Sequence, residues 1–273
     1  MNKSAFSLIE LSIVIMIMSL IITVVIGGRS LITQSRISRL TTEIHDIKQA
    51  LATFELTYDA LAGDFDNAYN LFADQGCGDD SSSGLSTSEK QAACNGDGDN
   101  NIEDNGITIS SLAGSSNGFF REEHNVWNHL HYSNIMHLSS SSTNYFAAKS
   151  FTDLTISYGS HDLSNNPEFK RPKNVLFIGS LRTDLISTDI TQTYALPASI
   201  ISPRIAEKLD TKLDDSVAFG GSMQGFGGYD DLGNASTNCS TPITNYNSSN
   251  NTDYILSHDD DECVLMIDVY TVN

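Results

Sequence analysis

The chain has 273 residues, of which 40% are hydrophobic and 18% are charged, so it can bury a core and is not disordered as a whole. Its 34 acidic and 15 basic residues give a formal net charge of −19 at pH 7. All of this excess lies after Ala60, because residues 1–60 carry five basic and five acidic side chains. A domain this acidic repels phosphate backbones, so we expect no nucleic-acid partner.

Residues 6–27 form an almost unbroken apolar run, rich in Ile, Leu, Val and Met. As a helix, these 22 residues would be about 33 Å long, which is enough to cross a bilayer. A cleaved secretory signal would have a shorter apolar run that ends at small residues. We therefore expect a membrane-spanning helix, for which a plain signal anchor is the simplest explanation. The basic residues around the run do not settle its orientation.

Glu10 is the one charged residue within this run. A carboxylate in a membrane span costs roughly 2.5–3.5 kcal/mol near the centre and less near the end, so it marks a functional site. No Lys or Arg lies within one helical turn of it in the sequence. A cut between Ala5 and Phe6 would create a terminal ammonium beside the bilayer, which is one cation that Glu10 could meet.

The segment Ala5-Phe6-Ser7-Leu8-Ile9-Glu10-Leu11, which follows a short leader containing Lys3, resembles the processing site of type IV pilins and type II secretion pseudopilins. The resemblance implies that a prepilin peptidase removes the leader, residues 1–5, and methylates the new terminal Phe6. It also implies that Glu10 neutralises the terminus of a neighbouring subunit during assembly. Ala5 stands where the family strongly prefers Gly.

After the apolar run, hydrophobic residues recur at spacings of three and four, which is typical of an amphipathic helix. They are Ile37, Leu40, Ile44, Ile47, Leu51, Phe54, Tyr58 and Leu61. We therefore expect one helix of about 84 Å, with a transmembrane half over residues 6–27 and an amphipathic half over residues 28–61. A coiled-coil stalk would show the same stripe, whereas the resemblance implies that the stripe packs on the sheet of a head domain.

Residues 62–273 form the expected acidic head, which is rich in Ser, Asn, Gly and Thr. Short apolar runs predict strands at residues 174–179, 193–195 and 264–269. Helices are expected at residues 122–136 and 203–213, the second with Ser202 as its N-cap and Pro203 at its first position. The fold class is therefore α+β, and the resemblance implies a pilin-like arrangement with the long helix packed on an antiparallel sheet.

Several blocks of the head are similar, in the same order, to a subgroup of bacterial pilin-like proteins. These blocks are a helix exit at residues 58–68, an acidic loop at 94–99, a helix at 122–130 and a helix-turn at 201–215. The resemblance therefore covers most of the chain and implies the same fold for the head.

Four cysteines lie in the head: Cys77, Cys94, Cys239 and Cys263. In a domain outside the cytoplasm they would form disulfides, for which three connectivities exist. Proximity in the sequence favours Cys77–Cys94 and Cys239–Cys263, each closing a loop of roughly 20 residues and contributing about 3 kcal/mol. The second pairing also resembles the loop that closes the C-terminus of many pilins. No CxxC pair is present, which argues against a zinc site.

The acidic loop is a candidate calcium site. Oxygen ligands stand at alternate positions, as in a calcium loop: Asp97, Asp99, Asn101 and Glu103. The site would not be an EF-hand, because Ile102 replaces the turn glycine and Thr108 stands where the bidentate Glu would be. A solvated turn is the alternative reading. Asp214-Asp215 and residues 258–262 are weaker candidates of the same kind.

Enzyme motifs are weak in this chain, and we do not expect an enzyme. Residues 114–118 match the G-x-S-x-G nucleophile elbow, but such a match arises by chance in a chain rich in Ser and Gly. No alternation of strands and helices is present to carry such an elbow. The four histidines at 124, 129, 131 and 137 do not have zinc-ligand spacing, and His129 is expected to belong to the packing of its helix.

The resemblance implies a structural subunit of a type IV pilus or a type II secretion filament, and the large head favours a minor or tip subunit. The expected partners are other pilin or pseudopilin subunits, the prepilin peptidase and the inner-membrane assembly platform. The expected location is the bacterial inner membrane, with one span and a periplasmic head, and then a periplasmic or extracellular filament. The alternatives are an adhesin or ligand-binding head displayed on a pilin-type anchor, and a membrane-anchored periplasmic enzyme.

Overall fold

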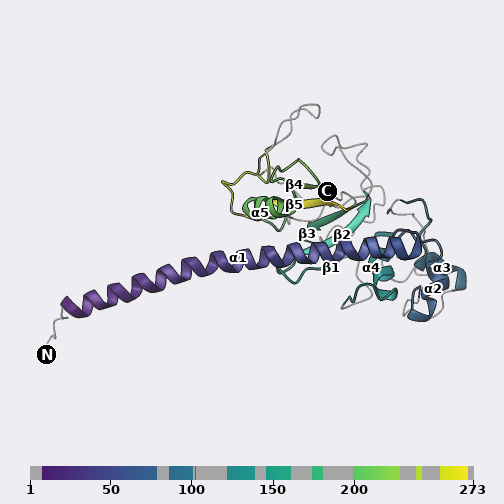
Figure 1. Ribbon diagram of the computed structural model, residues 1–273, viewed down its shortest axis with the longest axis horizontal. Helices are drawn as coiled ribbons and strands as arrows, with labels where there is room; N and C mark the ends of the chain where they lie inside the picture. Colours follow the sequence, from purple (N-terminus) through teal and green to yellow (C-terminus); the bar gives the residue numbers. More distant parts are fainter. Residues whose placement is uncertain are drawn as a thin grey trace.

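A computed structural model describes residues 8–78, 86–100, 102, 122–138, 146–160, 174–180, 199–227, 238–241 and 253–269. One long helix enters a head that contains a five-stranded antiparallel sheet and several short helices (Figure 1). This arrangement confirms the α+β class. Residues 1–7, which include Ala5 and Phe6, lie outside the described residues, as do Asn101, Glu103, the predicted strand at 193–195 and the segment 114–118.

The long helix α1 spans Leu8–Tyr58, 51 residues or about 76 Å. No proline interrupts this segment, and the helix continues through Gly27 and Gly28. Its N-terminal half extends well beyond the head (Figure 1). The helix ends at Tyr58 rather than near Leu61, because Asp59 adopts a left-handed conformation with a φ of 54°. The Asp59 N–H still donates to the Glu55 carbonyl oxygen, at 2.9 Å.

The predicted apolar stripe on the second half of α1 packs into the head. Buried side chains of the stripe are Ile37, Leu40, Ile44, Ile47, Leu51, Phe54 and Leu61. Tyr58 is partly buried against the same core. These side chains share one core with sheet residues such as Leu176 and Ile267. The stripe is therefore an intramolecular packing surface rather than the seam of a coiled coil.

The sheet has the strand order β1-β2-β3-β5-β4, and every neighbouring pair is antiparallel. The strands are β1 (Phe146–Ala147), β2 (Thr155–Ser160), β3 (Asn174–Gly179), β4 (Met223–Gly227) and β5 (Cys263–Asp268). β3 has the predicted bounds, and β5 begins and ends one residue earlier than predicted. β1, β2 and β4 were not predicted from the sequence.

The two faces of the sheet bury different side chains, as the two-residue period of a strand requires. Leu176 of β3 and Leu265 of β5 belong to the core that contains α1. Val175 and Val264, which alternate with them, belong to a second, smaller core. Because β3 and β5 are buried on both faces, their sequences are continuous apolar runs.

Two of the head helices were expected. Helix α5 (Pro203–Leu213) has the predicted bounds and begins with Pro203, but the Ser202 side chain makes no capping hydrogen bond. Helix α4 (Glu122–Tyr132) ends four residues before the predicted 136, at a turn where Asn134 has a φ of 57°.

Three further helical segments were not expected: α2 (Ala68–Phe72), a 3₁₀ turn at Ala73–Gln75 and α3 (Thr87–Cys94). A capping box starts α3, because the Ser86 hydroxyl accepts from the Glu89 N–H and the Glu89 carboxylate accepts from the Ser86 N–H.

Two disulfides join the four cysteines in the pairs that sequence proximity favours. Cys77–Cys94 ties the end of α3 to the turn after the 3₁₀ segment, with Cα atoms 5.5 Å apart. Cys239–Cys263 ties the start of β5 to residue 239, with Cα atoms 5.0 Å apart. No cysteine of the chain is left as a free thiol.

Gly63→Ala should destabilise the protein more than Gly76→Ala. Both glycines have a positive φ, 102° at Gly63 and 97° at Gly76, so a side chain at either costs about 1–2 kcal/mol in backbone energy. Only at Gly63 would the new β-carbon also overlap neighbours, because it would lie 2.7 Å from the Glu122 carbonyl oxygen. Gly76 has no heavy atom within 4 Å of that position.

We expect Gly63→Ala to lose a further 1–3 kcal/mol or so to this overlap. The measurement is urea unfolding of the full chain in neutral detergent, followed by the fluorescence of Trp127, the only tryptophan and a fully buried one. Equal losses in the two variants would show that the turn after α1 is not closely packed on α4.

Candidate functional site

The N-terminal half of α1 is a large exposed apolar surface. Side chains along it are well exposed, with Leu8 at 87% and Met16 at 66%. The helix is long and apolar enough to cross a membrane, and its most apolar part is not buried by the rest of the chain. An apolar surface of this size marks contact with a membrane or with other protein.

Three hydroxyl groups in this half of α1, those of Ser12, Ser19 and Thr23, are satisfied within the helix. Ser12 donates to the Ile9 carbonyl oxygen at 2.9 Å, and Ser19 donates to that of Met16 at 2.8 Å. Such bonds allow serine to lie in an apolar environment without an external partner. Glu10, in the first turn of the helix, differs from them because it carries a formal charge. It is the polar residue for which this surface needs a functional explanation.

The acidic loop meets a carboxylate from the turn after α1. Asp64, Asp97 and Asp99 have carboxylate oxygens within 4.8 Å of one another, whereas Asn101 and Glu103 are outside the described residues. Such oxygens are the ligands that calcium takes, so these three are the described residues of the acidic loop region that could hold it. The spacing 97, 99, 101, 103 did not point to Asp64.

Asp64 is buried, and backbone N–H groups of the loop surround it. Its Oδ1 accepts from the N–H of Gly98 at 2.6 Å and of Asp99 at 3.2 Å, and its Oδ2 accepts from that of Asn100 at 2.6 Å. Burial raises the pKa of Asp64, and the bonds from Asn100 and Gly98 partly offset this effect. The loop thus already balances the Asp64 carboxylate with its own backbone donors.

A second acidic cluster closes the turn between α5 and β4. Asp210, Asp214 and Asp215 have carboxylate oxygens within 4.8 Å of one another. Asp210 is fully buried and accepts from the Tyr254 hydroxyl at 2.8 Å and from the Ser216 N–H at 3.1 Å. Burial raises the pKa of Asp210 to about 6, although these two bonds act in the opposite direction.

Backbone groups also occupy the other carboxylates of this cluster. Asp214 accepts from the N–H of Met223 at 2.9 Å and from that of Ser222, and Asp215 accepts from the Val217 N–H at 2.9 Å. In the predicted segment 258–262, Asp259 pairs with Arg204. The carboxylates of the α5–β4 turn therefore have a structural use that requires no metal ion.

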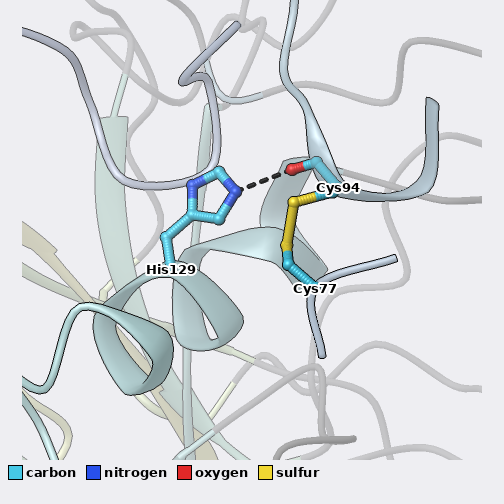
Figure 2. Close-up of side chains that lie close together, drawn as sticks. All are labelled: Cys77, Cys94 and His129. Atoms are coloured by element: carbon cyan, nitrogen blue, oxygen red, sulfur yellow. Dashed lines mark hydrogen bonds between the residues drawn. A yellow bond between two sulfur atoms is a disulfide. The ribbon is translucent and has the colours of Figure 1, made fainter. Parts of the chain in front are cut away.

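His129 joins three parts of the head. Its Nδ1 accepts from the Gly63 N–H at 2.9 Å, so the proton lies on Nε2, which donates to the Cys94 carbonyl oxygen at 2.7 Å (Figure 2). Its ring also stacks on Phe54 of α1, with centroids 5.8 Å apart. Burial lowers the pKa of His129 to about 4, and the bond to Cys94 opposes this shift.

His129 lies beside the Cys77–Cys94 disulfide without forming a metal site with it (Figure 2). Both sulfurs are bonded to each other, so neither can act as a thiolate ligand. His129 packs in the core, as expected from the sequence. His131 is partly buried and His137 is exposed.

No protein-family model, curated protein or solved structure matches this chain.

Asp64→Ala should lower the free energy of unfolding by about 1–3 kcal/mol, because three backbone N–H groups lose the acceptor that they share. Asp66→Ala is the matched control, since Asp66 is exposed two residues away and its loss should cost less than about 0.5 kcal/mol. Urea unfolding followed by Trp127 fluorescence gives both values. Two equally small losses would contradict a loop organised around Asp64.

Lowering the pH from 7 to 4.5 should destabilise the wild type more than His129→Gln. The folded state keeps His129 neutral down to about pH 4, whereas the unfolded chain takes up a proton below its ordinary pKa of 6.5. The free energy of unfolding therefore falls by about 1.4 kcal/mol per pH unit in this window, or nearly 3 kcal/mol in all. Glutamine retains a donor and an acceptor but does not titrate.

Asp210 acts in the opposite direction, because its raised pKa lets the folded state bind a proton first as the pH falls. This contribution is common to the wild type and His129→Gln, so it cancels in their difference. Unfolding curves of both proteins at pH 7 and pH 4.5 test the prediction. Parallel pH profiles would mean that His129 is not held neutral.

Proposed function

We propose that this chain is a pilin-like structural subunit whose long helix bundles with those of other copies or related subunits in a filament. The observation that carries the proposal is the division of α1 into two halves with opposite surroundings. The stripe of its second half is buried in the head, and its first half leaves the head as an exposed apolar rod. Only a bilayer or a bundle of similar helices offers this rod an apolar environment.

Glu10 favours a helix bundle over a simple anchor. A membrane anchor needs only apolar side chains, and a carboxylate adds an unfavourable free energy to its insertion. The resemblance of the segment from Ala5 to Leu11 to a pilin processing site supplies a use for this charge, which is to pair with the terminal ammonium of a neighbouring Phe6. The acidic heads would then lie on the outside of the filament, in solvent.

The two disulfides support a location of the head outside the cytoplasm, because disulfides persist in oxidising compartments. On this proposal the subunit waits in the bacterial inner membrane with its head in the periplasm, after a prepilin peptidase has cut before Phe6. An assembly platform in that membrane then transfers it to a type IV pilus or a type II secretion filament. The size of the head favours a minor or tip position.

Glu10→Ala should separate a filament subunit from a simple anchor. The variant should insert in the membrane at least as well as the wild type, because a charge has been removed from the span. In the filament it should be depleted more than a hundredfold, since an unpaired buried ammonium costs about 3 kcal/mol or more per subunit. Glu10→Gln should be nearly as defective, because an amide brings no negative charge.

The measurement compares the amount of protein in the membrane fraction and in filaments sheared from cells, with mass spectrometry to confirm a Phe6 terminus. Ser12→Ala is the matched control. It removes a hydroxyl close to Glu10 in the helix, and this hydroxyl donates to the Ile9 carbonyl oxygen of the same helix. If both Glu10 variants reach sheared filaments at wild-type levels, Glu10 has no pairing role in assembly. If the wild type itself is absent from sheared filaments, the filament proposal is wrong. A ligand-binding head displayed on an anchor would then be the better explanation.

A further inference from the structure

A basic pocket lies where α1 enters the head. Three residues of α1 and four of the turn between β1 and β2 line this cavity of about 350 Å³: Ser35, Arg36, Arg39, Lys149, Ser150, Phe151 and Thr152. Ile37, beside Arg36, is the first side chain of α1 to be buried among those that the structure describes. The pocket is therefore at the edge of the head nearest the exposed apolar half, where the turn after β1 is hydrogen-bonded to Glu43 of α1.

Glu43 holds the wall of the basic pocket in place. Its carboxylate accepts from the backbone N–H of Lys149 at 3.2 Å and from the Ser150 hydroxyl at 2.9 Å. These two bonds fix the turn against α1. It also pairs with the Arg39 Nε at 3.3 Å, so it compensates one of the three positive charges. Among the described residues, Arg36 and Lys149 have no ion-pair partner. The pocket thus keeps two uncompensated cations in a chain whose net charge is −19.

The basic pocket lies at the depth of lipid headgroups if α1 spans a bilayer as proposed. Exposed apolar side chains continue as far as Leu31 at 73% and Ile32 at 56%. Arg36 follows Ile32 by about 6 Å along the helix, and follows Gly27 by about 14 Å. The headgroup layer is roughly 5–8 Å thick on each side of the hydrocarbon core, and an Arg side chain extends several ångströms further.

We propose that the basic pocket binds the phosphate of an anionic phospholipid and so holds the base of the head on the membrane before assembly. The Arg36 guanidinium is a planar donor that matches phosphate oxygens, the Lys149 ammonium adds a point charge, and the hydroxyl of Ser35 can donate. An anionic membrane repels a head this acidic, so attachment needs a local positive site. The inference rests on the membrane location in the proposed function and does not require a filament.

The test uses the full chain in neutral detergent. Short-chain phosphatidylglycerol, below the concentration at which it forms micelles, is titrated by calorimetry, with phosphatidylcholine of the same chain length and inorganic phosphate as comparisons. We expect phosphatidylglycerol to bind more tightly than either. Arg36→Gln/Lys149→Gln should weaken its binding about thirtyfold, since each cation near a lipid surface contributes about 1 kcal/mol. Arg39 is left unchanged because it contacts Glu43.

Arg204→Gln/Lys208→Gln is the control of equal charge, because it removes two exposed cations of α5 that do not line the basic pocket, and it should change the affinity less than twofold. Arg204 pairs with Asp259 on the surface, and an exposed ion pair of this kind contributes little to stability. Arg36→Gln alone, on an exposed helical position, should weaken binding about fivefold. Trp127 fluorescence during urea unfolding verifies that each variant is folded.

Three outcomes would overturn the inference. Equal weakening in the control double variant would mean attraction to net charge alone. Inorganic phosphate binding as tightly as the lipid would make the pocket a site for free anions. The third outcome is that phosphatidylglycerol does not bind and that Lys149 cross-links to a carboxylate of a second copy in filaments. The basic pocket would then be a contact between subunits. All titrations use unassembled protein, so their failure leaves the filament proposal to be decided by the analysis of sheared filaments alone.

Discussion

The burial of one stripe of α1 is the interaction on which the rest of the structure depends. Ile37, Leu40, Ile44, Ile47 and Phe54 are fully or almost fully buried, and each contributes roughly 1.5–3 kcal/mol relative to an exposed position. These side chains pack the second half of one continuous helix against the head. Because the same helix continues without a break to Leu8, its apolar first half must leave the head. The exposed rod is thus a consequence of how the head folds.

The end of α1 is fixed by polar groups as firmly as its stripe is fixed by apolar ones. The Gly63 N–H donates to His129, and the Asp64 carboxylate next to it accepts from three N–H groups of the loop after α3. The same imidazole reaches Cys94 and so the disulfide. A buried N–H or carboxylate without such a partner costs more than a hydrogen bond contributes, so these bonds specify one path for the chain after α1.

Periodic and continuous apolar patterns predicted α1, β3 and β5, because each of these elements buries a face or both faces. Helix α5 was instead expected with Ser202 as its N-cap and Pro203 at its first position. β2 and β4 contain Ser, Gly and Gln, such as Gly159 and Gln224, and have no such pattern. The start of α3 is marked in the sequence by the capping-box residues Ser86 and Glu89, although this helix was not predicted. Asp64 lies more than 30 residues from the loop that it organises, and Glu43 lies more than 100 residues from Ser150. Spacing in a sequence shows no such pairing, because only the fold brings these groups together.

On the proposed function, assembly moves the apolar half of α1 from lipid into a bundle of helices. Lipid tails are about as apolar as leucine side chains, so burial of this surface changes little in the transfer and does not decide its direction. The polar groups at its two ends then decide it. At one end Glu10 would gain a cationic partner in the bundle. At the other end, with the basic pocket bound to lipid as we propose, Arg36 and Lys149 would leave the headgroups. The gain at Glu10 and the loss at Arg36 and Lys149 oppose each other in free energy. An assembly platform could therefore shift the equilibrium between membrane and filament with a modest input of free energy.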